Sequence, residues 1–489
     1  MTLADTLPDD VDRIVARAAG ASAVWAKTAP KERARVMYAV ADALDDAGAH
    51  LIAVAREETH LAEARLRGEL VRTSFQLRFL ADEVVRGQWL DARIDHADPQ
   101  WPMGAPRPDL RRMNVAVGPV VVFAAGNFPF AFSVAGGDTA SAWAAGNAVV
   151  LKIHPGHPRL SVETTRVIHD ALSRAGAPVA LLEAVSGTEA GVRVLRAPQI
   201  AAGAFTGSIA GGRALFDIAA ARPEPIPFFG ELGSVNPVFV TPGAARRRAE
   251  EIAEGFVASV TGSAGQLCTK PGLLFVPGES ALPALLSAAV LPPASAMLNE
   301  AMRAGFARRL GSLADRAEVA VLNGVVDETS TQPAPVLLRV SVESVLDDLD
   351  ALTGEVFGPA ALLVEYDDES VLPDLAARLE GQLTASLFAE TDDDLVGALL
   401  PVLSSRAGRV LWNQWPTGVS VTHAQHHGGP YPATTAPAST SVGAAAIDRF
   451  TRPVAYQNVP DALLPEPVRE ANPWRVPQLI DGVLTTPVA

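Results

Sequence analysis

The chain has 489 residues, and its 55 Asp and Glu against 40 Lys and Arg give a formal net charge of −15. With 48% hydrophobic and 19% charged residues, it is a globular chain whose length suits two or three domains. The acidic balance argues against nucleic acid and membrane surfaces as partners. The N-terminus is acidic where a secretory signal needs a basic start, so a cytoplasmic protein is expected.

Hydrophobic periodicity predicts helices in the first part of the chain. Val36, Val40 and Leu44 recur at four-residue spacing, which is typical of one helix face. The predicted helices are residues 31–59 and 66–87. The proline-containing stretch from Pro99 to Pro108 has little periodicity and is expected to run over the surface.

A strand–helix–strand pattern follows. The β-branched run Val115–Ala125 predicts a buried strand that is too short to span a membrane, Ala131–Ala145 a helix, and Ala148–Ile153 a second strand. Such a unit implies a parallel sheet with a right-handed crossover. The alternation continues to Ala221 and resumes from Asn236 to about Val410, which predicts an α/β fold with two domains.

The only cysteine, Cys268, is the first candidate for chemistry. A single cysteine excludes an intrachain disulfide and a multi-cysteine zinc site. Its neighbours Gly265, Gln266 and Thr269 are poor core residues, and a glycine-rich turn before a cysteine suits an exposed nucleophile. The alternative is a small buried core residue.

Other polar residues are candidates for the base and the ligand-binding groups that a nucleophile requires. Glu231 lies between two glycines and can serve as a base, although a surface acid at a strand end is the alternative. Asn127 follows a buried strand, where α/β sheets place ligands, but it is also a common turn residue. Gly207 and Ser208 follow a further strand and can hold phosphate at a helix N-terminus. No GxGxxG fingerprint is present.

Together these segments resemble the aldehyde dehydrogenase superfamily over nearly the whole chain. The motifs, in order, are Gly118-Pro119, Asn127-Phe128-Pro129, Ala145-Gly146-Asn147 leading to Lys152, Phe205-Thr206-Gly207-Ser208, Glu231-Leu232-Gly233, Gly265-Gln266-Leu267-Cys268-Thr269 and Glu355-Val356-Phe357-Gly358-Pro359. A closer likeness is to the bacterial α-ketoglutaric semialdehyde (2,5-dioxopentanoate) dehydrogenases. It rests on residues 133–140, 220–227, 427–430 and 460–465.

The resemblance implies a Rossmann-type cofactor domain, an α/β catalytic domain and a small oligomerisation arm. The expected division is residues 1–231 for the cofactor domain, with a surface or oligomerisation segment near 99–115, and residues 232–412 for the catalytic domain. Residues 413–489 would return to the cofactor domain and form an oligomerisation tail. A homo-oligomer, dimer or tetramer, is the expected assembly.

The resemblance also implies the chemistry. Cys268 would attack the aldehyde, the Asn127 amide and the Cys268 backbone N–H would hold the oxyanion, and Glu231 would activate water to hydrolyse the thioester. NAD or NADP would be held by the residues that match the family's cofactor motifs: Lys152, Gly207, Ser208, Leu232, Glu355 and Phe357. NADP is favoured, because the carboxylate that NAD-preferring relatives carry three residues after the lysine is Pro155 here, with His154, His157 and Arg159 close by in sequence.

The sequence departs from the family pattern in three further places. Ser234 replaces a glycine, and Gly126 replaces a bulky residue and is expected to open space near the nucleophile. The usual loop near the C-terminus is replaced by residues 426–430. His423, His426 and His427 in that region are a weak zinc signal without nearby cysteine or carboxylate ligands, so no metal is expected and a loop lining the access path of the substrate is favoured.

Arg72 and Gln76 are the candidates for substrate recognition. They are four residues apart on one helix face, and the resemblance puts this helix beside the substrate tunnel. Arg72 would bind a substrate carboxylate and Gln76 a keto or carboxylate oxygen, as α-ketoglutaric semialdehyde requires. The alternative is an Arg72–Glu69 pair on a solvated face. Functional alternatives are a broad or fatty aldehyde dehydrogenase, a cysteine-dependent amidase or esterase, and a non-catalytic homologue.

Overall fold

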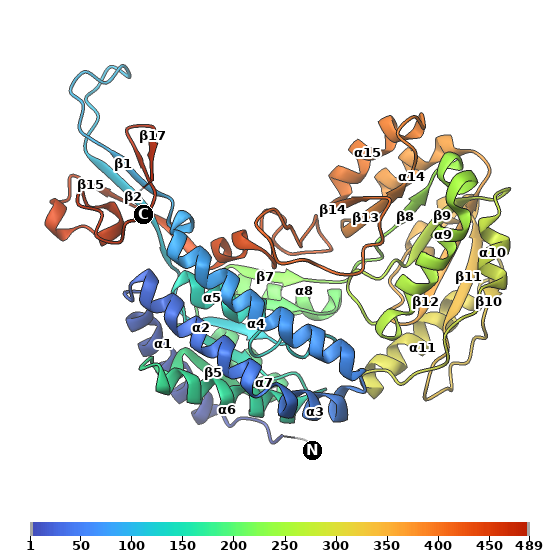
Figure 1. Cartoon of the computed structure of the whole chain (residues 1–489), viewed down its shortest axis with the longest axis horizontal. Helices are drawn as coiled ribbons and strands as arrows, with labels where there is room; N and C mark the ends of the chain where they lie inside the picture. The colour runs from blue at the N-terminus through green and yellow to red at the C-terminus, as the bar shows by residue number, and fades with distance from the viewer. Residues whose placement is uncertain (1–2, 487–489) are drawn as a thin grey trace.

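Short runs of β-branched and small apolar residues form two mainly parallel sheets, one in each of two lobes, and a third sheet forms an arm (Figure 1). This arrangement comes from a computed structural model that describes residues 3–486. The predicted α/β class with parallel sheets is confirmed. The two parallel sheets and their helices make two lobes, and the arm projects from the lobe that contains the N-terminal helices (Figure 1).

The first lobe is built on a five-stranded parallel sheet in the order β5-β4-β3-β6-β7. Its strands are β3 (Val120–Phe123), β4 (Val149–Lys152), β5 (Leu182–Val185), β6 (Ala202–Thr206) and β7 (Phe228–Glu231). The helices between them are α5 (Gly137–Ala145), α6 (Pro158–Arg174), α7 (Thr188–Arg196) and α8 (Ile209–Ala220). The alternation predicted for this region is therefore confirmed, with shifts of a few residues at element ends.

Four helices precede this sheet and pack on its helices. They are α1 (Pro8–Trp25), α2 (Pro30–Asp46), α3 (Gly48–Thr59) and α4 (Glu63–Arg86). The predicted single helix over 31–59 is wrong, because the helix is interrupted at Ala47. This residue is both the C-cap of α2 and the N-cap of α3. The helix predicted over 66–87 is confirmed as α4, whereas α1 was not predicted.

The second lobe contains a seven-stranded sheet in the order β10-β11-β12-β9-β8-β13-β14, parallel except for β10. Its strands are β8 (Val238–Val240), β9 (Leu273–Pro277), β10 (Ala320–Asn323), β11 (Val336–Ser341), β12 (Ala360–Tyr366), β13 (Gln382–Phe388) and β14 (Ala407–Trp412). Its helices are α9 (Pro242–Thr261), α10 (Leu282–Ala288), α11 (Glu300–Ala314), α12 (Val342–Asp347), α13 (Leu349–Leu352), α14 (Leu372–Arg378) and α15 (Leu395–Arg406).

The arm is a sheet made by segments far apart in the sequence, in the order β15-β2-β1-β16-β17. Its strands are β1 (Ala92–Asp95), β2 (Leu110–Ala116), β15 (Thr451–Gln457), β16 (Gln478–Ile480) and β17 (Val483–Thr485). The stretch Pro99–Pro108 lies in the long connection between β1 and β2, as predicted (Figure 1). The division into domains at residues 231 and 412 stays a prediction, although β7 and β14 end at these positions.

The predicted strand Val115–Ala125 is wrong in one respect, because it is two strands in two different sheets. β2 ends at Ala116 in the arm and β3 begins at Val120 in the first lobe. Gly118 between them has φ +125°, a backbone conformation that favours glycine, and Pro119 has no N–H to continue a ladder. The helix predicted over 131–145 begins only at Gly137, after a non-helical segment.

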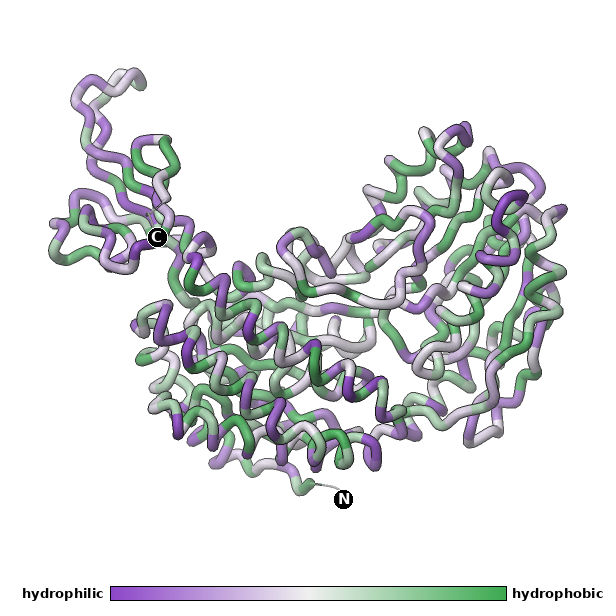
Figure 2. Tube along the Cα trace, viewed as in Figure 1, coloured by the Kyte–Doolittle hydropathy of each residue, from purple (hydrophilic) through white to green (hydrophobic). Residues whose placement is uncertain are grey.

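The hydrophobic runs of both parallel sheets lie inside the lobes, where Figure 2 shows apolar colour along the strands. Each lobe buries its own core, centred for example on Val121 and Val150 in the first and on Phe275 and Val364 in the second. Over residues 3–486, no helix combines the length and apolar character needed to cross a bilayer.

Candidate active site

Several of the site residues proposed from the sequence line one cavity between the two lobes. A cavity of about 440 Å³ is lined by Asn127 beyond β3, by Gly207 and Ser208 beyond β6, and by Leu232 beyond β7. The second lobe contributes Cys268, Glu355 and Phe357 to the lining. Because the first-lobe segments follow the carboxyl ends of parallel strands, the cavity stands where α/β sheets bind ligands.

Cys268 is presented by a sharply turned segment. Ser263, Ala264 and Gly265 all have positive φ, at 51°, 53° and 66°, so three successive residues adopt the left-handed conformation. A Cβ atom at Gly265 would lie 2.1 Å from the carbonyl oxygen of Gly358, so only glycine allows this close packing. The turn leaves Cys268 partly exposed on the cavity wall.

The electrostatic surroundings of Cys268 disfavour its thiolate. Burial, with the negative charges of Glu231 and Glu355, raises the pKa of Cys268 above the ordinary thiol range. A nucleophilic role therefore needs a base that takes the thiol proton as the sulfur attacks.

His427 is placed to be that base. Its Nε2 lies 3.8 Å from the Cys268 Sγ and 2.9 Å from Glu231 Oε1, and its side chain is fully buried. The second carboxylate oxygen of Glu231 accepts a hydrogen bond of 2.5 Å from the Ser441 hydroxyl. Burial alone would raise the pKa of Glu231, but attraction to His427 and hydrogen bonds from His427 and Ser441 outweigh it, and the pKa is lowered. Glu231 is therefore ionised at neutral pH.

The role of His427 was missed at the level of sequence. The expectation that residues 426–430 merely line the access path is corrected, because His427 reaches the nucleophile itself. His423 lies elsewhere, paired with Glu83 on α4. Glu231, Cys268 and His427 have ligand atoms within 4.8 Å of one another and could also hold a metal ion, so the absence of a metal stays a prediction.

Asn127 is held against the nucleophile segment. Its Nδ2 donates a hydrogen bond of 3.1 Å to the carbonyl oxygen of Gln266, two residues before Cys268. A primary amide has two N–H donors, so one remains for a developing oxyanion.

The cofactor-side residues are arranged as an anion and ribose site would require. Ser208 caps the N-terminus of α8, and its hydroxyl oxygen accepts the N–H of Gly211, which leaves its own O–H free to donate. Such a helix N-terminus favours phosphate. Glu355 and Phe357 line the same cavity, whereas Lys152 stands outside its lining at the end of β4, half-buried. The residues present therefore fit a dinucleotide.

Gly126 does not open the space that was expected. A Cβ atom at this position would lie 2.6 Å from the His154 ring and 2.9 Å from the terminal carbon of Met302. The room left by the glycine is filled by these two side chains. Burial lowers the pKa of His154 to about 3, so the imidazole is neutral.

Arg72 and Gln76 both point into the protein interior. Arg72 stacks on Phe132 with 5.5 Å between its Cζ and the ring centroid, and its Nε donates to the carbonyl of Val419. Among the residues that the structure describes, its two terminal nitrogens and both polar atoms of the Gln76 amide are buried without a partner. The alternative Arg72–Glu69 pair is not formed, since Glu69 pairs with Arg65 and accepts the backbone N–H groups of Phe130 and Ala131.

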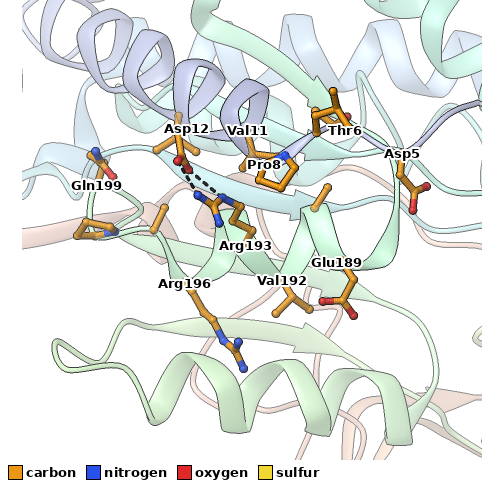
Figure 3. A pocket seen from close by; sticks show the side chains of 15 residues that line it. Asp5, Thr6, Pro8, Val11, Asp12, Glu189, Val192, Arg193, Arg196 and Gln199 are labelled. Atoms are coloured by element: carbon orange, nitrogen blue, oxygen red, sulfur yellow. Dashed lines mark hydrogen bonds and ion pairs between the residues drawn. The ribbon is translucent and has the colours of Figure 1, made fainter.

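A larger hollow, of about 870 Å³, lies between the N-terminal segment and α7 (Figure 3). The Asp12–Arg193 ion pair stands on its wall, and its other lining residues include neither cysteine nor histidine. The candidate site is therefore the smaller cavity between the lobes.

Comparison with known proteins gives concordant results. A model of the aldehyde dehydrogenase family matches residues 1–452. The α-ketoglutaric semialdehyde dehydrogenase of Acinetobacter baylyi is 40% identical over 483 residues, covering 98% of this chain and 92% of that protein. The α-ketoglutaric semialdehyde dehydrogenase 2 of Azospirillum brasilense is 43% identical over 482 residues, covering 97% and 91%.

The fold has close counterparts among solved structures. The NADP-dependent glyceraldehyde-3-phosphate dehydrogenase of Bacillus halodurans superposes with a TM-score of 0.76 at 21% identity, over 93% of this chain and 92% of that one. At this identity the likeness concerns the fold.

Proposed function

The chain belongs to the aldehyde dehydrogenase family, and from this premise we propose that it oxidises an aldehyde to a carboxylic acid through a thioester on Cys268. Enzymes of this family use NAD or NADP. The observation that carries the proposal is the convergence of the His427 Nε2 and the Glu231 carboxylate next to the Sγ of Cys268, a residue that lines the cavity. This convergence also favours the dehydrogenase over a non-catalytic homologue.

In the first half of the reaction, the Cys268 sulfur attacks the aldehyde carbon. The His427 Nε2 takes the thiol proton as it passes its own proton to the Glu231 carboxylate 2.9 Å away, and Glu231 releases this proton to solvent before hydrolysis. The oxyanion of the thiohemiacetal is held by the free N–H of the Asn127 amide and the backbone N–H of Cys268.

Bound NAD(P) supplies the hydride acceptor, and the residues that would hold it are Lys152, Gly207, Ser208, Leu232, Glu355 and Phe357. In the second half of the reaction, Glu231 takes a proton from water, which attacks the thioester and releases the acid and the Cys268 thiolate.

The proposed substrate is α-ketoglutaric semialdehyde, oxidised to 2-oxoglutarate. Support comes from the two relatives that carry this name at 40% and 43% identity. Further support comes from the buried, unpartnered polar atoms of Arg72 and Gln76, since a carboxylate and a keto oxygen would satisfy them. The negative charges of Cys268, when ionised, and of Glu231 also act on the Arg72 guanidinium and favour its charged form.

Arg72→Ala should raise the Michaelis constant for α-ketoglutaric semialdehyde about 10–100-fold, since a charge-assisted hydrogen bond contributes roughly 1.5–3 kcal/mol. An uncharged aldehyde of the same length should be affected much less. Initial rates for both aldehydes measure the difference, with Arg78→Ala as the matched control on the same helix, because Arg78 pairs with Asp42 and Asp45.

Equal effects of Arg72→Ala on the two aldehydes would assign Arg72 to structure alone. A wild-type enzyme that prefers long-chain aliphatic aldehydes to the acidic one would instead favour the fatty or broad-range alternative.

We further propose that NADP is used at least as well as NAD, because Pro155 carries no carboxylate to repel a 2′-phosphate. His157 and Arg159, which lie near Pro155 in sequence, are less able to bind the 2′-phosphate than the sequence suggests. His157 donates to the Ala125 carbonyl and Arg159 pairs with Glu57, so neither is free for a phosphate. Burial lowers the pKa of Lys152, while Asp5 in the N-terminal segment acts on it in the opposite sense.

The ratio of kcat/KM for NADP to that for NAD should therefore be one or more in the wild type. Asp5→Asn should raise this ratio by up to about fivefold, since an exposed charge contributes up to roughly 1 kcal/mol. Asp9→Asn in α1 is the control. A strong wild-type preference for NAD would contradict the proposal.

Assembly and compartment remain proposals as well. Val483 and Leu484 on the edge strand β17 are exposed at 67% and 66%, and an edge strand with apolar side chains suits pairing with a second copy. We propose a homo-oligomer formed through the arm. A catalytic thiol also suits a reducing compartment such as the cytoplasm.

A further inference from the structure

Lys270, two residues after Cys268, is buried with 3% of its surface exposed. Its ammonium group donates hydrogen bonds of 2.8 Å to the carbonyl oxygen of Val356 and 2.6 Å to that of Ala360. The two carbonyls flank Phe357 and closely follow Glu355. The side chain therefore ties the segment of the nucleophile to the segment of Glu355 and Phe357.

The backbone that carries Lys270 is held in place by hydrogen bonds of its own. The Nδ2 of Asn236 donates to the carbonyl oxygens of Cys268 at 2.8 Å and of Lys270 at 3.0 Å, which fixes the backbone on both sides of Thr269. The close packing of Gly265 on Gly358 joins the same two segments at a second point.

Lys270 and Glu355 also interact electrostatically. Burial raises the pKa of Glu355 to about 7, and Lys270 counteracts this shift. Burial in turn lowers the pKa of Lys270 to about 8, against attraction from Glu355. An ammonium buried on two neutral carbonyls costs free energy, so core stability alone is a poor reason to keep it.

The choice of lysine is also informative. The chain has four lysines, Lys27, Lys31, Lys152 and Lys270, and uses arginine for its other permanent cations. The two that are not on the surface are Lys152, proposed to contact the cofactor, and Lys270. The compact ammonium of Lys270 donates to two carbonyls at once.

We propose that Lys270 is a positioning residue for NAD(P). It holds the segment of Glu355 and Phe357 at the distance from Cys268 that the nicotinamide ribose requires. This inference rests on the proposed function, because it takes Glu355 as a cofactor contact. Lys270 itself touches neither the cofactor nor the substrate.

The test is cofactor binding by Lys270→Met, which keeps the length of the side chain and removes both hydrogen bonds and the charge. Titration of tryptophan fluorescence with NADP and NAD should show a Kd at least tenfold above that of the wild type. The rate at which iodoacetamide alkylates Cys268 without cofactor should stay within about threefold. Lys31→Met, at an exposed position on α2, is the matched control and should change neither quantity.

A purely structural role would lower the melting temperature and leave the Kd of the folded protein unchanged, which would overturn the proposal. Lys270→Gln, which keeps an uncharged N–H donor group on a shorter side chain, should give an intermediate Kd and serves if the methionine variant does not fold. Failure of both to fold would assign Lys270 to stability and also overturn the proposal.

Glu355→Gln separates this inference from its premise. If Glu355→Gln weakens cofactor binding and Lys270→Met does not, only the positioning role fails. If Glu355→Gln leaves the Kd unchanged, the assignment of Glu355 to the cofactor fails first.

Discussion

Replacing Cys268 by alanine should lower aldehyde-dependent reduction of NAD(P) by at least about 10³-fold, because no covalent intermediate can form. The chain has no other cysteine to substitute for it. Cofactor binding should persist, since in the proposed site the cofactor is held by other residues and alanine only removes the sulfur. Steady-state rates and a fluorescence titration of the same preparation measure the two quantities.

The pH dependence of the thiol gives a second readout of the same residue. Because burial and the charges of Glu231 and Glu355 raise the pKa of Cys268, its thiolate fraction without cofactor should keep rising above pH 8. The rate of alkylation by iodoacetamide should rise with it. Retention of several per cent of the dehydrogenase activity in Cys268→Ala would overturn the covalent mechanism.

Replacing Glu231 by glutamine should slow thioester hydrolysis roughly 10²–10⁴-fold, the usual contribution of a general base. The amide keeps the size of the side chain and can still accept the Ser441 hydrogen bond, but it cannot take a proton from water. Because acylation uses His427 as well, the first turnover should be less affected. Stopped-flow absorbance should show a burst of reduced cofactor followed by slow turnover.

His427→Gln is the matched variant, since it changes the other partner of the 2.9 Å contact. The thiol proton then has no acceptor 3.8 Å from the sulfur, so the burst itself should be slowed. A Glu231→Gln enzyme with neither a burst nor slow turnover would remove Glu231 from the role of hydrolytic base. A normal burst rate in His427→Gln would remove His427 from acylation.

Local patterns in the sequence predicted much of the fold. Runs such as Val149–Lys152 are apolar and β-branched wherever they lie, so the parallel sheet of the first lobe could be anticipated. The resemblance implied an arm, but its strand pairing could not be anticipated, because β1 pairs with β16 across nearly the whole chain and neither strand has a strong pattern of its own. Gly118-Pro119 interrupts the apolar run Val115–Ala125, but the change of sheet at this point was not predicted, because it depends on tertiary pairing.

The residues of the candidate site also fall into those that sequence motifs predicted and those that only the tertiary structure reveals. Cys268, Glu231 and Asn127 stand in recognisable motifs, and the structure brings them to one region between the lobes. His427 lies 159 residues from Cys268, and no spacing in the sequence indicates that they meet. Lys270 was overlooked because burial, not its neighbours, distinguishes it from a surface lysine. The space beside Gly126 was misjudged since His154 and Met302 come from other segments.

The covalent mechanism is tested most directly by detecting the acyl group on Cys268. Glu231→Gln enzyme is mixed with α-ketoglutaric semialdehyde and NADP, quenched in acid during the slow phase, digested and analysed by mass spectrometry. Covalent catalysis by Cys268 predicts a 2-oxoglutaryl thioester on the peptide that contains this residue, in an amount equal to the burst of reduced cofactor. Reduced cofactor formed in a burst without any acyl group on Cys268 would contradict it.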